Sequence, residues 1–223
     1  MLARSGENQY VRTMRKNLAL AIVAAVSLLA CAAGEPGSGG AAVPRGKETD
    51  AMQAVGKLEY AILGGGCFWC LEAAYELLPG VVSVENGYAG GSRRNPSYEQ
   101  VSSGETGHAE VVRVVYDPAK VSYEELLDLF WKIHDPTTED RQGADIGSQY
   151  RSVIFYADEE QRLSAEASMR ETQRRLVDPI VTELLPVPDF WIAEDYHQDY
   201  FRRNPNAAYC RIVIAPKLKK AGF

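Results

Sequence analysis

The sequence predicts an α+β fold, a ferredoxin-like α/β sandwich in which helices cover one mixed, mainly antiparallel sheet. Three observations support this prediction. The 223 residues are 46% hydrophobic, which suits one globular domain with an appendage. Strand and helix patterns interleave in the approximate order β-α-β-β-α-β-α-β, and the chain has no internal repeats. One sheet covered by helices accommodates that order.

Short apolar or β-branched runs predict the strands. The first run stops at three glycines, and a later one stops at Asp117-Pro118. The expected strands cover 59–63, 81–88, 110–116, 150–156, 180–185 and 209–215. Two long polar loops, 89–107 and 134–149, lie between them, and loops of this length in compact domains are often functional.

Spacing and capping residues predict the helices. The apolar positions of 68–78 recur at helical intervals, and Pro79-Gly80 ends that pattern. Ser122 forms a capping box with Glu125 for a helix over 123–133. A long charged helix capped by an aspartate is expected over 158–177, and a short one over 194–203.

Residues 1–30 have the composition of a signal peptide. Basic residues precede the apolar run LALAIVAAVSLLACAAG, which is shorter than the about 20 residues of a membrane span. The run includes Leu28-Leu29-Ala30-Cys31, which resembles the lipobox of bacterial lipoproteins, where the cysteine is lipidated. An ordinary signal peptide, with Cys31 incidental, is the alternative. We favour lipidation of Cys31, which would place the protein on the cell envelope, facing the periplasm or the cell exterior.

Three segments are therefore expected: a signal peptide at 1–30, a flexible linker at 31–56 and a catalytic domain at 57–223. The formal net charge is −6, and residues 1–30 carry four basic groups and one acid, so their removal leaves −9. An acidic chain has no general affinity for nucleic acid, and none is expected as a partner.

The segment GGGCFWC, Gly64 to Cys70, carries the strongest chemical signal. A strand, glycines, a cysteine and then a helix place Cys67 at a helix amino terminus, where we expect the thiol pKa to be lowered. Cys70 lies one turn further, within reach for a disulfide. Phe68 and Trp69 between the thiols favour the wall of an apolar pocket, with a role in the core as the alternative.

Metal binding and general disulfide exchange are the competing interpretations of this segment. Zinc needs four ligands, but only Cys210 and three histidines remain and no second paired spacing exists, so no metal is expected. Thioredoxin-like proteins normally carry small residues or a proline between their thiols. A zinc-binding lipoprotein and a thiol–disulfide oxidoreductase nevertheless stay as alternatives.

Polar side chains at the loop ends complete the candidate site. Glu110 stands where a loop enters an apolar strand, so we expect it to be desolvated and to hold a proton that it can donate. Tyr88 and Tyr150 offer phenol donors beside glycines. His197 and Tyr200 lie in a late polar segment, where a histidine is more often structural than catalytic.

Nine motifs occur in a fixed order between about 59 and 217: GGGCFWC, GYAGG, NPSYEQV, GETGHAE, VYDPAKVSYEELL, HDPTT, RQGADIGSQYRS, AEDYHQDYF and YCRIVIAPK. This ordered set resembles peptide-methionine (S)-S-oxide reductase, the A-type methionine sulfoxide reductases. The resemblance implies an enzyme that reduces the S epimer of methionine sulfoxide, free and in proteins. It implies that Cys67 attacks the sulfur, Glu110 protonates the oxygen, and Tyr88 and Tyr150 bind that oxygen. The implied substrate-binding residues are Phe68, Trp69, Asp145, His197 and Tyr200.

The resemblance also implies a redox cycle. Attack leaves a sulfenic acid on Cys67, which a second thiol converts to a disulfide. We favour Cys70 as this resolving thiol, because it is one helical turn away, with Cys210 as a possible second one. The implied partners are oxidised proteins and peptides and a thioredoxin-like reductant, with no bound cofactor, and we expect a monomer.

Overall fold

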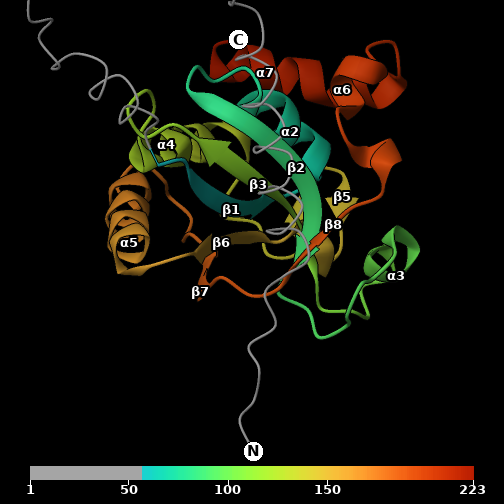
Figure 1. The fold of residues 1–223 in the computed structure, drawn as a ribbon, viewed down its shortest axis with the longest axis horizontal. Coiled ribbons are helices and arrows are strands. Elements are labelled where there is room, and N and C mark those ends of the chain that lie inside the picture. The colour runs from blue at the N-terminus through green and yellow to red at the C-terminus, as the bar shows by residue number, and fades with distance from the viewer. Residues whose placement is uncertain (1–56) are drawn as a thin grey trace, which may run out of the picture. The chain divides into compact units, whose positions relative to one another are not determined.

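The computed structural model describes residues 57–223, so the expected signal peptide, the linker and Cys31 lie outside the described residues. The described part is built on a six-stranded sheet with the strand order β7-β6-β1-β3-β2-β8 (Figure 1). The strands are β1 (Glu59–Gly65), β2 (Val81–Ala89), β3 (Ala109–Tyr116), β6 (Ser152–Tyr156), β7 (Glu183–Pro186) and β8 (Phe190–Ile192). A separate hairpin joins β4 (Arg141–Gln142) to β5 (Asp145–Ile146).

The helices are α2 (Phe68–Tyr75), α3 (Tyr98–Ser102), α4 (Tyr123–Ile133), α5 (Glu159–Gln173), α6 (Tyr200–Arg203) and α7 (Ala215–Ala221). Single 3₁₀ turns cover Ser148–Tyr150 and Asp195–His197, and a π-helical turn covers Cys210–Ile214. Within 57–223 no helix is long and apolar enough to cross a membrane.

All neighbouring strands of the large sheet run antiparallel except β6 and β7, which are parallel. The mixed, mainly antiparallel sheet of an α+β fold is therefore confirmed. Register brings two site residues together, because Tyr88 of β2 lies directly opposite Glu110 of β3. Side chains opposite each other on antiparallel strands point to the same face.

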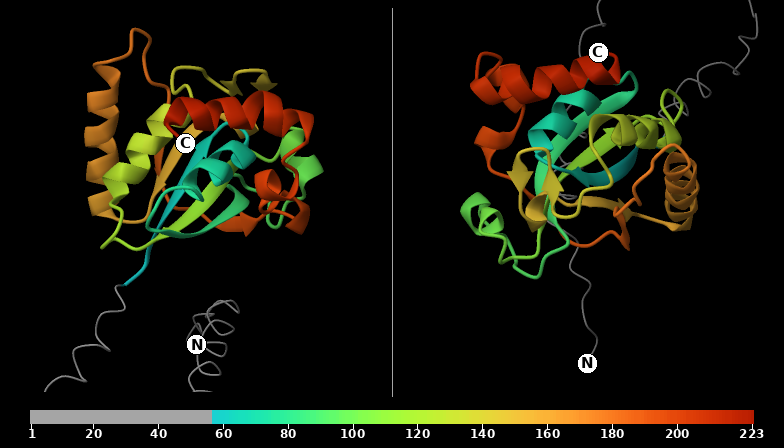
Figure 2. Two further views of the ribbon diagram at one scale, coloured as in Figure 1. Left: turned by 90° about the horizontal axis from the view of Figure 1, so that it is seen from above. Right: turned by 180° about the vertical axis from the view of Figure 1, so that it is seen from behind.

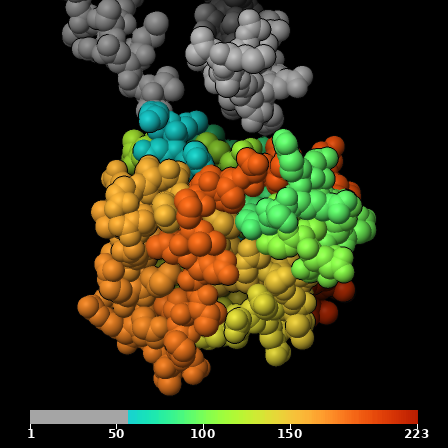
Figure 3. Space-filling model, turned by 90° about the horizontal axis from the view of Figure 1, so that it is seen from below, coloured from blue at the N-terminus to red at the C-terminus, as the bar shows by residue number. Residues whose placement is uncertain are grey.

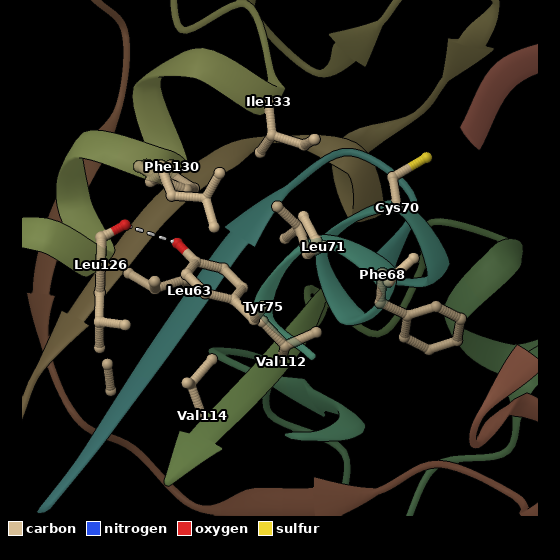
Figure 4. Close-up of a cluster of buried hydrophobic side chains, with 14 of the residues drawn as sticks. Leu63, Phe68, Cys70, Leu71, Tyr75, Val112, Val114, Leu126, Phe130 and Ile133 are labelled. Carbon is tan, nitrogen blue, oxygen red and sulfur yellow. Dashed lines mark hydrogen bonds between the residues drawn. The ribbon is translucent and has the colours of Figure 1, made fainter. Parts of the chain in front are cut away.

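The main core lies between the sheet and the helices α2, α4 and α7, which contact one another (Figure 2). Leu71 and Tyr75 of α2 point into it, against Leu63 of β1 and Phe130 of α4 (Figure 4). Each such buried side chain contributes about 1.5–3 kcal/mol of transfer free energy. The Tyr75 hydroxyl donates to the Leu126 carbonyl over 2.9 Å, so the buried phenol is satisfied and α2 is tied to α4.

The opposite face of the sheet has a smaller apolar cluster that includes Val111, Val153 and Phe155. Val187 and Phe190, from the connection between β7 and β8 and from β8 itself, pack against it. This part of the chain (orange) crosses the surface between the α5 side and the loop that follows β2 (green) in Figure 3. Both faces of the sheet are thus covered, which leaves the strand ends to form a site.

The predicted helix caps are confirmed at α4 and α5. The Ser122 hydroxyl accepts a bond from the Glu125 amide over 3.2 Å, and the Glu125 carboxylate accepts one from the Ser122 amide over 2.8 Å. Asp158 accepts a bond from the Gln161 amide over 2.9 Å. The α5 helix ends at Gln173, four residues before the predicted end.

The strand predicted over 209–215 is wrong, since these residues form the π-helical turn that leads into α7. Cys210 and Ile214 are buried one turn apart, whereas Ile212 between them is 72% exposed. That burial has a helical period, which overrides the strand propensity of the β-branched residues. Three short elements were not predicted: α3, β8 and the β4–β5 hairpin.

Candidate active site

Cys67 is the N-cap residue of α2, and Gly66 alone separates it from the end of β1. Gly66 has φ +91°, and a Cβ atom there would lie 2.5 Å from Gln142 Cγ. Only glycine fits this left-handed, crowded position. The tight turn carries the chain from the sheet into α2 and leaves the Cys67 side chain 7% exposed.

Glu110 lies against the start of the same helix. Its Oε2 accepts a hydrogen bond from the Phe68 amide over 3.1 Å, and the side chain is 1% exposed. Burial raises the pKa of Glu110 to about 8, although the Phe68 amide acts in the opposite direction. The predicted desolvation of Glu110 is confirmed, and this carboxyl holds its proton at neutral pH.

The pKa values of the two thiols differ from the prediction. The pKa of Cys67 is raised well above its usual value by burial, by its hydrogen bond with the Cys70 thiol and by the Glu110 charge. The expected lowering of the Cys67 pKa is therefore wrong, because these three effects outweigh the helix terminus. The same thiol–thiol bond lowers the pKa of Cys70 to about 7, and the Lys217 charge acts in the same direction.

A protonated Glu110 changes the balance at Cys67. The negative charge of an ionised Glu110 disfavours a thiolate at Cys67, and this charge is absent when Glu110 is protonated. The Glu110 pKa of about 8 removes that charge at neutral pH. A neutral acid beside the thiol thus both holds a proton and favours the thiolate.

The predicted tyrosines lie close to this acid. Tyr88 is buried opposite Glu110, and its hydroxyl donates to Glu194 Oε2 over 2.9 Å. Burial raises the pKa of Tyr150, and the charges of Glu110 and Cys67 raise it further. Both phenols are therefore neutral donors at physiological pH.

Aromatic rings surround the amino-terminal end of α2. The Trp69 ring stacks on Tyr200 with centroids 3.6 Å apart and 6° between planes. The Phe68 and His197 rings are 5.0 Å apart, and neither nitrogen of the buried His197 ring has a hydrogen-bond partner among the described residues. Phe68 belongs to the core, and the partly buried Trp69 packs against it. The role of this pair as the wall of an apolar pocket stays a prediction.

The carboxyl-terminal segment closes the site from the other side. The Tyr209 hydroxyl donates to Asp145 Oδ2 over 2.8 Å and lies 3.9 Å from Cys70 Sγ. Cys210 is fully buried, and burial raises the pKa of its thiol. Cys67, Cys70 and Cys210 are all free thiols here.

Sequence reasoning missed three residues of this arrangement. Glu194 accepts bonds from the Tyr88 hydroxyl and, over 2.9 Å, from the Tyr98 amide. Tyr98 contacts the His197 ring with centroids 4.5 Å apart, and Tyr209 contacts Asp145. All three lie inside the quoted motifs AEDYHQDYF, NPSYEQV and YCRIVIAPK, next to polar or aromatic positions.

Metal-ligating side chains do not gather in the described domain. Within 57–223 no group of three or more His, Cys, Asp and Glu side chains could hold a metal ion. The chemistry available at the site is that of thiols, a protonated carboxyl and phenols. These groups define a thiol-dependent oxidoreductase.

Comparison with known proteins identifies the family. The family model described as peptide methionine sulfoxide reductase matches residues 59–222. Peptide methionine sulfoxide reductase MsrA of Sulfolobus acidocaldarius is 53% identical over 163 residues, which are 73% of this chain and 93% of that protein. MsrA of Thermus thermophilus is 56% identical over 163 residues, with the same 73% and 93% covered.

Solved structures agree with this result. Mxr1 from Saccharomyces cerevisiae in reduced form superposes with a TM-score of 0.66 at 36% identity, over 69% of this chain and 90% of that one. Methionine sulfoxide reductase A of Corynebacterium diphtheriae gives a TM-score of 0.62 at 37% identity, over 67% of this chain and 76% of that one. The chain belongs to the peptide methionine sulfoxide reductase family. Its activity is that of EC 1.8.4.11, the reduction of peptide methionine sulfoxide.

Proposed function

We propose that this enzyme reduces the S epimer of methionine sulfoxide, free and in proteins, at Cys67, and that it repairs oxidised proteins of the bacterial cell envelope. One observation carries the catalytic part: the acid Glu110, with a pKa of about 8, is bonded to the amide next to Cys67. A sulfoxide oxygen is a poor leaving group until it is protonated, so a neutral acid beside a thiol is the required pair.

The substrate side chain occupies the aromatic end of α2. Its methyl group packs on Phe68 and Trp69, the sulfur faces Cys67, and Asp145 and the His197–Tyr200 segment contact its main chain. The oxygen then faces Glu110 and the Tyr150 hydroxyl. Tyr88 has one hydroxyl hydrogen, which it gives to Glu194 in the free enzyme. Tyr88 therefore reaches the substrate oxygen only by giving up that bond.

The chemical step converts one thiol and one sulfoxide to a sulfenic acid and methionine. The Cys67 thiolate attacks the sulfoxide sulfur, and Glu110 gives its proton to the oxygen. The sulfur–oxygen bond breaks as the hydroxyl group passes to Cys67, which is oxidised while the substrate is reduced. Cys67 releases one proton when it forms the thiolate, and the ionised Glu110 takes up one proton after the step, so no net proton is consumed and the acid is ready for the next cycle.

Cys70 resolves the sulfenic acid. Its thiol lies one helical turn from Cys67, and attack on the sulfenic sulfur forms the disulfide and releases water. Cys210 serves as a possible second resolving thiol. The cycle uses no bound cofactor, because an external thioredoxin-like dithiol reduces the final disulfide. The enzyme acts as a monomer.

An epimer assay tests the catalytic proposal. The protein is supplied with excess dithiothreitol and, separately, with the S and R epimers of a methionine-sulfoxide peptide. We expect methionine from the S epimer alone, and none from Cys67→Ser. Turnover of the R epimer, or activity in Cys67→Ser, would refute the proposal.

The lipobox-like segment Leu28-Leu29-Ala30-Cys31 supports the envelope location, and lipidation of Cys31 has its own test. We expect the protein to stay with membranes through a high-salt wash and to be released by detergent, because an acyl chain holds it by apolar contact. Cys31→Ala should appear in the soluble fraction. Release of the full-length wild-type protein by salt alone would contradict the anchor.

A further inference from the structure

Glu72 of α2 is a buried charged residue that the proposed mechanism does not use. Its side chain is 1% exposed. Its Oε1 accepts a hydrogen bond from the Asp199 amide over 2.6 Å, and its Oε2 accepts one from the Tyr200 amide over 3.0 Å. A buried carboxylate is tolerated only when its oxygens are hydrogen-bonded, and here two consecutive backbone amides supply the bonds.

These two bonds hold the chain at a bend. Asp199 has φ +55°, a left-handed conformation that costs about 1–2 kcal/mol for a residue other than glycine. Its own carboxylate pairs with Arg202 and Arg203 and does not cap α6. Glu72 is therefore the side chain that fixes the backbone where α6 begins.

The bend determines where the Tyr200 ring lies. That ring stacks on Trp69, which precedes Glu72 by three residues on α2. Residues three apart lie on neighbouring parts of one helix surface. One helix thus carries both Trp69 and the carboxylate that holds the stacking partner of Trp69.

A second polar contact holds the same segment closer to His197. The Asn86 side-chain amide donates to the His197 carbonyl over 2.8 Å, and the Asn86 backbone amide donates to Gln198 Oε1 over 2.9 Å. The segment is therefore held at two points, by Asn86 near His197 and by Glu72 near Tyr200.

We propose that Glu72 is a positioning residue that holds Tyr200 against Trp69 and thereby sets the apolar wall for the methionine side chain. This inference rests on the proposed substrate-binding role of Trp69. Glu72 touches neither the substrate nor the reacting atoms. Its removal should therefore weaken substrate binding and leave the chemical step intact.

The matched variants are Glu72→Gln and Glu76→Gln. Glu76 is the C-cap residue of α2, one turn further along, and pairs with Arg202, whereas the two amides donate to Glu72. Glu72→Gln keeps the shape but replaces one of the two acceptor oxygens by an NH2 group, which cannot accept from a backbone amide. We therefore expect KM for the S-epimer peptide to rise about tenfold with kcat within about twofold. In Glu76→Gln, both constants should stay within about twofold of wild type.

A double-mutant cycle separates positioning from general stabilisation. If Glu72 acts through Tyr200, then Glu72→Gln should change KM less than about twofold once Tyr200→Ala is present. An equal rise in KM in both backgrounds would overturn the proposal. A loss confined to kcat in Glu72→Gln would overturn it as well.

Amide hydrogen exchange in the wild-type protein provides a test that needs no variant. The Asp199 and Tyr200 amides should exchange slowly, because both donate to a buried carboxylate. Rapid exchange at these two amides would overturn the proposal even if Glu72→Gln failed to fold. This result is independent of the epimer assay, so failure of the proposed function and failure of this inference are distinguishable.

Discussion

Replacement of Glu110 by glutamine tests the central electrostatic feature of the site. The variant keeps the size and the acceptor for the Phe68 amide but has no proton to donate. General acid catalysis contributes about 10²–10⁴-fold to a rate, so we expect a loss of that size in methionine formation. Cys67 should still react with iodoacetamide, because the thiol remains in place.

The stability of this variant should depend on pH in a defined direction. The pKa of Glu110 is about 8 in the folded protein and 4.5 ordinarily, a rise worth about 5 kcal/mol at about 1.4 kcal/mol per unit. A raised pKa contributes stability below pH 4.5 that is lost as the pH rises through about 8. Glutamine never ionises, so Glu110→Gln should gain stability relative to wild type over that window.

Two measurements test whether Glu110 is a buried, protonated acid and whether it acts in catalysis. Urea unfolding at pH 5 and pH 9 should show the variant's advantage only at pH 9, and wild-type turnover should fall above pH about 8. An unfolding free-energy difference that is the same at both pH values would refute the buried, protonated acid. Full turnover in Glu110→Gln would refute its catalytic role.

Four further substitutions test the thiols, the turn and the core. In a burst assay, Cys70→Ser should release the first methionine at the wild-type rate but slow later turnovers by about tenfold or more. Cys210→Ser should change the rate of later turnovers by less than about threefold. The reverse pattern would make Cys210 the resolving thiol. Gly66→Ala should lose at least about 2 kcal/mol of stability, since its Cβ would clash at a left-handed position, and an unchanged melting temperature would contradict that strain. Tyr75→Phe should lose about 1 kcal/mol of unfolding free energy in urea, because the Leu126 carbonyl of α4 loses the phenol donor. Unchanged or increased stability would show that this bond does not stabilise the fold.

The parts of the fold predicted from sequence were those with strong local signals. The α4 helix has the predicted bounds, because Ser122 and Glu125 form its capping box and its apolar spacing is regular. The strand predicted over 209–215 was wrong because its local signal disagrees with its packing. Ile212, Val213 and Ile214 favour a strand locally, but packing of this turn against α2 and its continuation into α7 make it helical.

The properties of the candidate site, too, were predicted only where a local sequence signal determines them. Burial of Glu110 followed from its place between a polar loop and an apolar strand. The pKa of Cys67 did not follow, because it depends on the Cys70 thiol and on Glu110, which only the fold brings beside it. The bond between Glu72 and the Asp199 amide joins positions 127 apart in sequence, and no local pattern indicates it.

Tyr88 lies opposite Glu110 on β2 and β3, so the register of these two strands determines where the acid of the site lies. Strand side chains alternate between faces, so a slip of one residue would turn Glu110 away from Cys67 while most backbone bonds re-formed. The distance between Glu110 and Cys67 is thus set by the strand register of the folded domain, before substrate binds. Insertions of one residue within either strand should therefore abolish turnover.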